Sequence, residues 1–149
     1  MIAPRQIMVA MDFSEISEAA VNCAVELAKR FDAELVGCHV LEPHHLLPDM
    51  TDMGESANVD LRASNARELV EKLLREAGAD RFRVLIEKGH ANKEIVRAAR
   101  NEGIGMIVVG THGRSGLAHA LLGSTAEYIV RHAGCPVLVA KPTMVAVPA

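Results

Sequence analysis

Aromatic residues are nearly missing from this sequence, and basic residues show no excess. Only 3% of the 149 residues are aromatic and there is no tryptophan, so the chain lacks a set of rings on which single-stranded nucleic acid could stack. The formal net charge is −3, whereas a nucleic-acid-binding domain normally presents a basic face. These two absences argue against a nucleic-acid partner.

Cysteines are few, and no apolar run approaches the length of a membrane span. Cys23, Cys38 and Cys135 are scattered without a CxxC spacing. This pattern is typical of reduced, partly buried thiols rather than of a disulfide framework or a zinc site. The N-terminal segment leads directly into an apolar strand, so we expect no signal peptide. We therefore expect a cytoplasmic protein without a membrane anchor.

What the chain does contain is a regular alternation of strand and helix patterns. Half of its residues are hydrophobic, and its length suits a single domain over residues 1–149. Short apolar runs predict five strands, at residues 6–11, 33–41, 81–88, 105–109 and 136–140. Amphipathic and capping patterns predict four helices, over residues 15–31, 58–77, 92–102 and 124–133. Residues 42–57 show no period, and we expect a long, mobile surface loop there.

Particular residues are expected to begin, end or bury these helices. Ser14 should cap the first helix, and Ser124 with Glu127 has the spacing of a capping box. Gly78 should end the second helix, and Gly37 should allow a helix to pack closely on its strand. The buried stripe of the first helix is predicted to be Ile16, Ala20, Cys23, Ala24, Leu27, Ala28 and Phe31. The buried stripe of the second is predicted to be Leu61, Ala66, Leu69, Val70, Leu73, Leu74 and Ala77.

The order of the elements predicts the fold class. Alternating strands and helices imply right-handed crossovers and an α/β fold, with a five-stranded parallel sheet and helices on both faces. We expect the strand order 3-2-1-4-5, with the partly charged strand 81–88 at one edge. Ligands of such sheets bind beyond the carboxyl ends of the strands, where the winding reverses. In this order the reversal lies between the first and fourth strands, which places Asp12 beside Gly110.

A glycine-rich stretch, GTHGRSGLAHALLGST, follows the fourth strand at residues 110–125. A glycine-rich turn from a strand to a helix N-terminus exposes backbone N–H groups to a phosphate. The P-loop pattern GxxxxGK[ST] and the dinucleotide pattern GxGxxG are both missing. The glycines instead follow the spacing Gly110-x-x-Gly113, nine residues, Gly123-Ser124, which predicts a phosphate-binding loop. The alternative is an ordinary flexible connection, in which case Asp12 is simply a turn residue.

This spacing, G-x2-G-x9-G-[ST], resembles the ATP-binding signature of the universal stress protein family. The resemblance spans the chain, from VAMDFSEIS at the first strand to THGRSGLAHALLGSTAEYIVRHAGCPVLVAKP near the end. It implies a Rossmann-like, adenine-nucleotide alpha hydrolase-like fold that binds ATP (or AMP or ADP), with Mg²⁺ held by the phosphates. Two positions depart from the family pattern. His119 stands where the family often has a basic residue, and Gly105 stands where the family usually has an acidic residue.

The resemblance also implies roles for individual residues. The nucleotide's sugar would be lined by Ala10, Met11 and Asp12, with the carboxylate accepting hydrogen bonds from the ribose hydroxyls. The adenine edge would pair with backbone groups of Val40. The ribose and phosphates would be wrapped by Gly110, Thr111, His112, Gly113 and Arg114. The terminal phosphates would be held by Gly123, Ser124 and Thr125.

Several polar side chains keep two interpretations. His112 and Arg114 suit either a phosphate contact or a solvated loop position. A cluster in the 42–57 segment contains potential metal ligands, but its spacing fits no ligand template, so we predict no metal site. Its members are His44, His45, Asp49 and Asp52.

No catalytic constellation of nucleophile, base and orienting group can be assembled from these residues. The SGGxDS and HxGH motifs of related adenine-nucleotide enzymes are missing as well. We therefore expect a regulatory module, in which ATP holds the glycine loop in an arrangement that a protein partner reads. The alternatives are a slow ATP hydrolase, with Asp12 or His112 assisting water attack, and a structural stress-response dimer with an incidental nucleotide.

The last strand bears on self-association. Residues 136–140 (PVLVA) form an apolar edge in the expected order, with no charge before Lys141. Uncharged edges invite pairing with another chain. We predict a homodimer through antiparallel pairing of Pro136–Ala140, with the apolar tail adding contact. The alternative is an edge covered by the chain's own tail.

Overall fold

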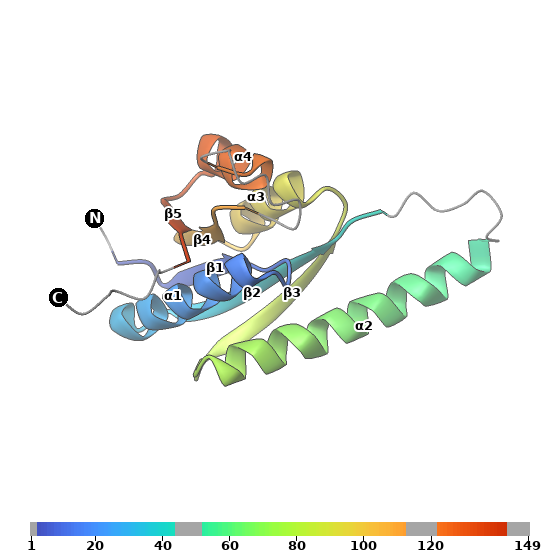
Figure 1. Ribbon diagram of the computed structural model, residues 1–149, viewed down its shortest axis with the longest axis horizontal. Helices are drawn as coiled ribbons and strands as arrows, with labels where there is room; N and C mark the ends of the chain where they lie inside the picture. Colours follow the sequence, from blue (N-terminus) through green and yellow to red (C-terminus); the bar gives the residue numbers. More distant parts are fainter. Residues whose placement is uncertain (1–2, 44–51, 113–121, 143–149) are drawn as a thin grey trace.

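Figure 1 shows the computed structural model, which describes residues 3–43, 52–112 and 122–142, with the backbone alone for residues 52–57. Strands and helices alternate along these residues. The strands are β1 (Gln6–Ala10), β2 (Glu34–Leu41), β3 (Phe82–Lys88), β4 (Met106–Gly110) and β5 (Val137–Ala140). The helices are α1 (Glu15–Phe31), α2 (Asp52–Glu76), α3 (Ala91–Asn101) and α4 (Ser124–His132).

The strands form one parallel sheet in the order β3-β2-β1-β4-β5, which confirms the predicted order. The central strand is β1, where Met8 lies between Val36 of β2 and Ile107 of β4. The described strands β3 and β5 lie at the two edges. The direction of winding reverses between β1 and β4, so the carboxyl ends of these two strands meet at the expected ligand position.

Helices cover both faces of the sheet, with α1 and α2 on one side and α3 and α4 on the other (Figure 1). The hydrophobic core between the sheet and helices α1 and α2 is centred on the fully buried side chains of Ile7, Leu35, Val70 and Leu74. The hydrophobic core on the opposite face, under α3 and α4, is centred on the fully buried side chains of Met8, Val36, Ile107 and Ile129. Neighbouring residues of a strand point to opposite faces, so a strand covered on both sides is apolar throughout.

Helix α1 begins as predicted, because the Ser14 hydroxyl accepts a hydrogen bond from the Ser17 N–H at 3.2 Å. It ends at Asp32, whose φ of 52° is left-handed. The predicted buried stripe is correct at Ala20, but Phe31 is wrong: this ring is 41% exposed. Phe31 is the last residue of the helix, just before the chain turns into β2, so the helical period reaches this residue but the surface that would bury the ring does not.

Helix α2 is longer than predicted, because it begins at Asp52 rather than at residue 58. Its end near Gly78 is as predicted, and Gly78 has a left-handed φ of 87°. Leu74 is fully buried, but Leu61 and Leu69 are 61% and 37% exposed, against the prediction. The amino-terminal half of α2 extends past the sheet in Figure 1, and the exposure of Leu61 agrees with its position in this half of the helix. Within the described residues, no helix combines the length and hydrophobicity needed to cross a membrane.

The predicted close approach of a helix at Gly37 is confirmed. A Cβ at this position would lie 2.8 Å from Val70 Cγ1 and 2.9 Å from Leu74 Cδ1. Real Cβ atoms essentially never approach other atoms so closely, so glycine allows α2 to pack directly against β2.

Candidate functional site

The candidate site lies where β1 and β4 end side by side. Their register runs from Ile7 opposite Met106 to Val9 opposite Val108. Beyond Ala10, the Met11 N–H still donates to the Cys38 carbonyl at 2.8 Å, and the chain then turns into α1. The topology therefore brings the segment 10–12 and the start of the glycine-rich stretch to one edge of the sheet, as predicted.

Asp12 organises the turn between β1 and α1. Its Oδ1 accepts hydrogen bonds from the Ser14 N–H at 2.9 Å and the Ser14 hydroxyl at 2.6 Å. Its own N–H donates to the buried Ser17 hydroxyl at 3.2 Å. The residue as a whole is half-buried at the carboxyl edge of the sheet. Asp12 thus has a structural role in the turn, and its contact with a ribose stays a prediction.

Val40 directs its backbone groups toward the space beyond the end of β1. In a parallel strand, the N–H and C=O of alternate residues point to the same side. The Cys38 carbonyl points to β1, because it accepts the Met11 N–H. The peptide groups of Val40, two residues further on, therefore point to the same side, where β1 has already ended. This direction suits the predicted pairing with an adenine edge.

The two ends of the glycine-rich stretch meet in the structure. The Gly123 N–H donates to the Thr111 carbonyl at 2.6 Å, and Thr111 is buried. His112, the next residue, is half-buried. Gly113 and Arg114, which the prediction places around the phosphates, lie outside the described residues, as does His119. The hydrogen bond closes the base of the stretch and brings Thr111 to the N-terminus of α4.

The capping-box prediction at α4 is wrong. The N-cap is Gly123, with no side-chain hydrogen bond to the helix, and Ser124 is already inside the helix. The Glu127 N–H donates to the Gly123 carbonyl at 2.9 Å, so Glu127 belongs to the first regular turn. Ser124 is exposed and Thr125 is half-buried in this first turn, where the helix dipole favours anions. The hydroxyls therefore lie at a positive helix end without the role of a cap.

Gly110 has a packing function that the sequence did not reveal. A Cβ there would lie 2.8 Å from Ile16 Cγ2 and 3.1 Å from the Ile16 carbonyl oxygen. Helix α1 therefore crosses directly over the end of β4. This contact explains the glycine without any ligand, and the predicted approach of an oxyanion is a separate hypothesis.

Two further residues of the site were missed by the sequence reasoning. Phe13 has a left-handed φ of 66°, and its ring stacks on that of His39 at 4.3 Å between centroids. The His39 Nδ1 lies 2.6 Å from the Met11 carbonyl oxygen. A histidine between Cys38 and Val40 in a mainly apolar strand was the available signal, since its side chain falls on the same face of β2 as Leu35 and Gly37.

The three cysteine thiols, of which Cys38 is buried and Cys23 and Cys135 are half-buried, are unsuited to nucleophilic chemistry. Burial, reinforced by the carboxylates of Glu87 and Glu94, raises the pKa of Cys38 to about 12. Burial also raises the pKa of Cys23 and Cys135 above the ordinary thiol value. Since the thiolate is the nucleophilic form, these cysteines are inert at neutral pH.

The described residues contain no cluster of three or more His, Cys, Asp or Glu able to hold a metal ion.

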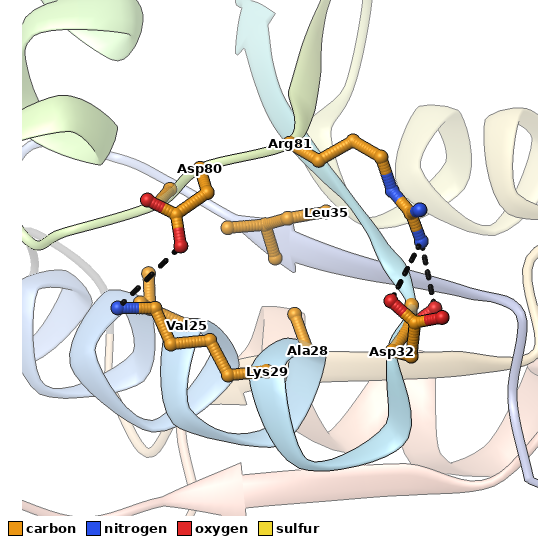
Figure 2. Close-up of a pocket in the computed structure, with 9 residues that line it drawn as sticks. Val25, Ala28, Lys29, Asp32, Leu35, Asp80 and Arg81 are labelled. Atoms are coloured by element: carbon orange, nitrogen blue, oxygen red, sulfur yellow. Dashed lines mark hydrogen bonds and ion pairs between the residues drawn. The ribbon is translucent and has the colours of Figure 1, made fainter.

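Two surface hollows flank α1, and both are separate from the described glycines of the site. The first, of roughly 230 Å³, lies at the opposite, amino-terminal edge of the sheet. Figure 2 shows Leu35 in it, with two ion pairs across the opening: Lys29 with Asp80 at 4.0 Å, and Arg81 with Asp32 at 3.7 Å. The second, of roughly 240 Å³, lies between α1 and α2, behind the turn at Phe13. In the first hollow, the charged side chains drawn in Figure 2 are paired with one another. The first hollow therefore adds nothing to the candidate site.

A doubly wound parallel sheet with a glycine-rich connection and a carboxylate at its switch point defines a Rossmann-like α/β domain of the type that binds ligands at this edge. The chain belongs to the universal stress protein family, whose sequence model matches residues 4–141. Universal stress protein MJ0531 of Methanocaldococcus jannaschii is 34% identical over 151 residues, covering 92% of this chain and 82% of that protein. Universal stress protein E of Escherichia coli is longer: it is 28% identical over 130 residues, which cover 85% of this chain and 41% of that protein.

Solved structures agree with this assignment. Universal stress protein UspA from Lactobacillus plantarum is 27% identical, with a TM-score of 0.78, over 91% of this chain and 96% of that one. A universal stress protein in complex with cAMP is 22% identical, with a TM-score of 0.71, over 95% of this chain and 99% of that one. At 22% identity the second likeness establishes the fold alone.

Proposed function

We propose that this chain binds an adenine nucleotide at the edge between β1 and β4 and acts as a nucleotide-dependent switch in a stress response. ATP is the expected ligand, with ADP and AMP as alternatives. The observation that carries the proposal is the 2.6 Å hydrogen bond from the Gly123 N–H to the Thr111 carbonyl. It joins the two ends of the glycine-rich stretch at the N-terminus of α4, which favours a phosphate. The pairing of β1 with β4 puts the segment that carries Asp12 at the same edge of the sheet.

The described residues supply complementary groups for such a ligand. The Asp12 carboxylate lies at this edge of the sheet, and an ionised carboxylate accepts hydrogen bonds of the kind that ribose hydroxyls donate. The backbone of Val40 points toward the expected adenine position. Ser124 and Thr125 offer hydroxyl donors for the phosphates in the first turn of α4. Mg²⁺, where present, would be held mainly by the phosphates and water.

The first test is to denature the purified protein and identify any released nucleotide by chromatography. Titration calorimetry of nucleotide-free protein with ATP, ADP, AMP and cAMP then ranks the ligands. The cAMP complex of the fold neighbour is the reason to include a cyclic nucleotide. Phosphate release in the same samples separates a binding module from a slow hydrolase. A protein that neither carries nor binds any of these nucleotides would disprove the proposal.

Gly123→Val tests the position of the phosphates. Gly123 has φ −68° and ψ 159°, a conformation that any residue adopts, so the backbone tolerates valine. We expect at least a tenfold loss of ATP affinity, because a branched side chain obstructs the N-terminus of α4. Gly134→Val is the matched control beyond the other end of the same helix, where a Cβ meets nothing within 4 Å. Equal affinity in the two variants would contradict the assignment.

We further propose that the protein is a homodimer formed through β5. The Ile107 N–H donates to the Pro136 carbonyl. Because backbone groups of alternate residues point to the same side of a strand, the N–H and C=O groups of Leu138 and Ala140 also point to β4. The N–H of Val139 therefore points to the open edge. Val139→Pro therefore removes a donor from the edge without breaking the β4–β5 ladder. By sedimentation we expect a dimer for the wild type and for Val139→Ala, and a monomer for Val139→Pro. A monomeric wild type at micromolar concentration would disprove the dimer.

A further inference from the structure

Phe13 has an unusual backbone conformation for its residue type. Two non-glycine residues in the described part of the chain have a left-handed φ, Phe13 at 66° and Asp32 at 52°. Aspartate adopts this region readily and ends α1 there. A bulky aromatic residue is an outlier, and such a conformation persists only when the surrounding structure holds it. The turn that carries Asp12 is therefore held under strain.

One side chain holds this turn at two points. The His39 ring stacks on the Phe13 ring, with 4.3 Å between centroids and 29° between planes. Its Nδ1 lies 2.6 Å from the Met11 carbonyl oxygen. A carbonyl oxygen only accepts, so Nδ1 carries the proton and donates. His39 thus contacts the residue before Asp12 and the residue after it.

We infer that His39 is a positioning residue of the nucleotide site, which keeps the Asp12 carboxylate at the edge between β1 and β4. Asp12 is the single residue between the two contacts, so its backbone cannot move away from this edge unless one of them breaks. The hydrogen bonds from Ser14 to Asp12 Oδ1 then set the direction of the carboxylate from the helix side. This inference rests on the proposed nucleotide binding, which it extends to a residue outside the glycine signature.

The test compares two histidines with the same pair of contacts. His39→Phe keeps a ring for stacking but cannot donate to the Met11 carbonyl. His132→Phe is the matched control, because His132 stacks on Tyr128 at 4.1 Å and its Nδ1 lies 2.9 Å from the Tyr128 carbonyl, at the carboxyl end of α4. We expect His39→Phe to raise the hydrogen-exchange rate of the Ser14 amide and the dissociation constant for ATP about tenfold each. His132→Phe should change neither.

A second variant keeps the inference testable if His39→Phe folds poorly. Phe13→Gly accepts a φ of 66° without steric cost, so it should fold while losing the ring that stacks on His39. Because the half-buried ring also packs against the core, exchange and affinity are measured well below the melting temperature of the variant. We expect faster Ser14 exchange and weaker ATP binding, while the amides of β4 keep their wild-type exchange rates. A merely structural role would raise the exchange rates of β4 as well.

The two hypotheses fail in different ways. If the wild type binds no adenine nucleotide, the proposed function is wrong, and the Ser14 exchange rate alone then decides whether His39 holds the turn. If the wild type binds ATP but His39→Phe and Phe13→Gly leave both exchange and affinity unchanged, the positioning role of His39 is wrong and the proposed function stands.

Discussion

Gly110 ends β4 beneath the first turn of α1, and Gly110→Ala tests why glycine is needed there. The added Cβ would lie 2.8 Å from Ile16 Cγ2, 3.1 Å from the Ile16 carbonyl oxygen and 3.4 Å from its carbonyl carbon. Carbon atoms in contact are normally about 3.5–4.0 Å apart. The Ile16 side chain can rotate, but its carbonyl belongs to the backbone of α1. Relief therefore requires a shift of the helix away from the sheet.

The contact with backbone sets the magnitude of the effect. Overpacking of a well-packed core costs about 1–3 kcal/mol. We expect about 2–3 kcal/mol for Gly110→Ala, because a shift of α1 also loosens Ala20, Val21 and Ala24, which are buried against the sheet. In a domain of this size, 1 kcal/mol corresponds to about 2–4 °C in melting temperature. The melting temperature should therefore fall by about 4–12 °C.

The assay is thermal unfolding followed by circular dichroism, with and without saturating ATP. Gly134→Ala is the control for the same chemical change, because its Cβ meets nothing within 4 Å. Its free energy of unfolding should stay within about 1 kcal/mol of wild type. Wild-type stability of Gly110→Ala would refute the packing explanation. Lost ATP affinity at unchanged stability would instead show that Gly110 serves the ligand.

Two other predictions concern the core. Measured by urea unfolding, Leu74→Ala should lower the free energy of unfolding by about 2–5 kcal/mol. Leu61→Ala on the same helix should lower it by less than about 1 kcal/mol. Equal losses of stability in the two variants would contradict the burial of Leu74 and the exposure of Leu61. Because the pKa of Cys38 is raised to about 12 from an ordinary 9.0, the unfolded thiol ionises first as pH rises above 9. Wild-type stability should therefore fall from about pH 9 to about pH 12 by up to about 1.4 kcal/mol per pH unit. The stability of Cys38→Ala should fall less steeply over the same pH range. An equal fall in the wild type and the variant would contradict the raised pKa of Cys38.

The elements of this protein are well specified by local patterns. Continuous apolar runs predict β1 and β4, because strands covered on both faces have no polar side to show. Ser14 predicts the start of α1 because its hydroxyl satisfies an N–H that the helix leaves unpaired. Gly78 predicts the end of α2 because its left-handed φ favours glycine. The alternation of strands and helices and the handedness of their crossovers restrict the strand order to a few possibilities, and the expected order 3-2-1-4-5 is one of the common doubly wound orders.

Predictions that depended on neighbouring surfaces were less reliable. The helical period of α2 correctly indicates that one face is apolar, but it carries no information on where the sheet stops, so Leu61 was misplaced. The start of α2 at Asp52 was missed because a segment beyond the sheet needs no apolar stripe in order to continue a helix. At α4 the sequence pattern suited a cap at Ser124, but the hydrogen bond of Gly123 to Thr111 fixes the chain entry one residue earlier.

The sequence by itself determined the α/β fold, the strand order, the family signature and the edge at which a ligand is expected. These depend on side-chain periodicity, helix ends and motif spacing, all of which act over short stretches of chain. Only the tertiary structure decided which atoms meet at that edge. The packing of Ile16 over Gly110 and the contacts of His39 with Met11 and Phe13 join residues from different elements. Such contacts depend on the separation of packed layers, a distance that no local pattern of residues contains.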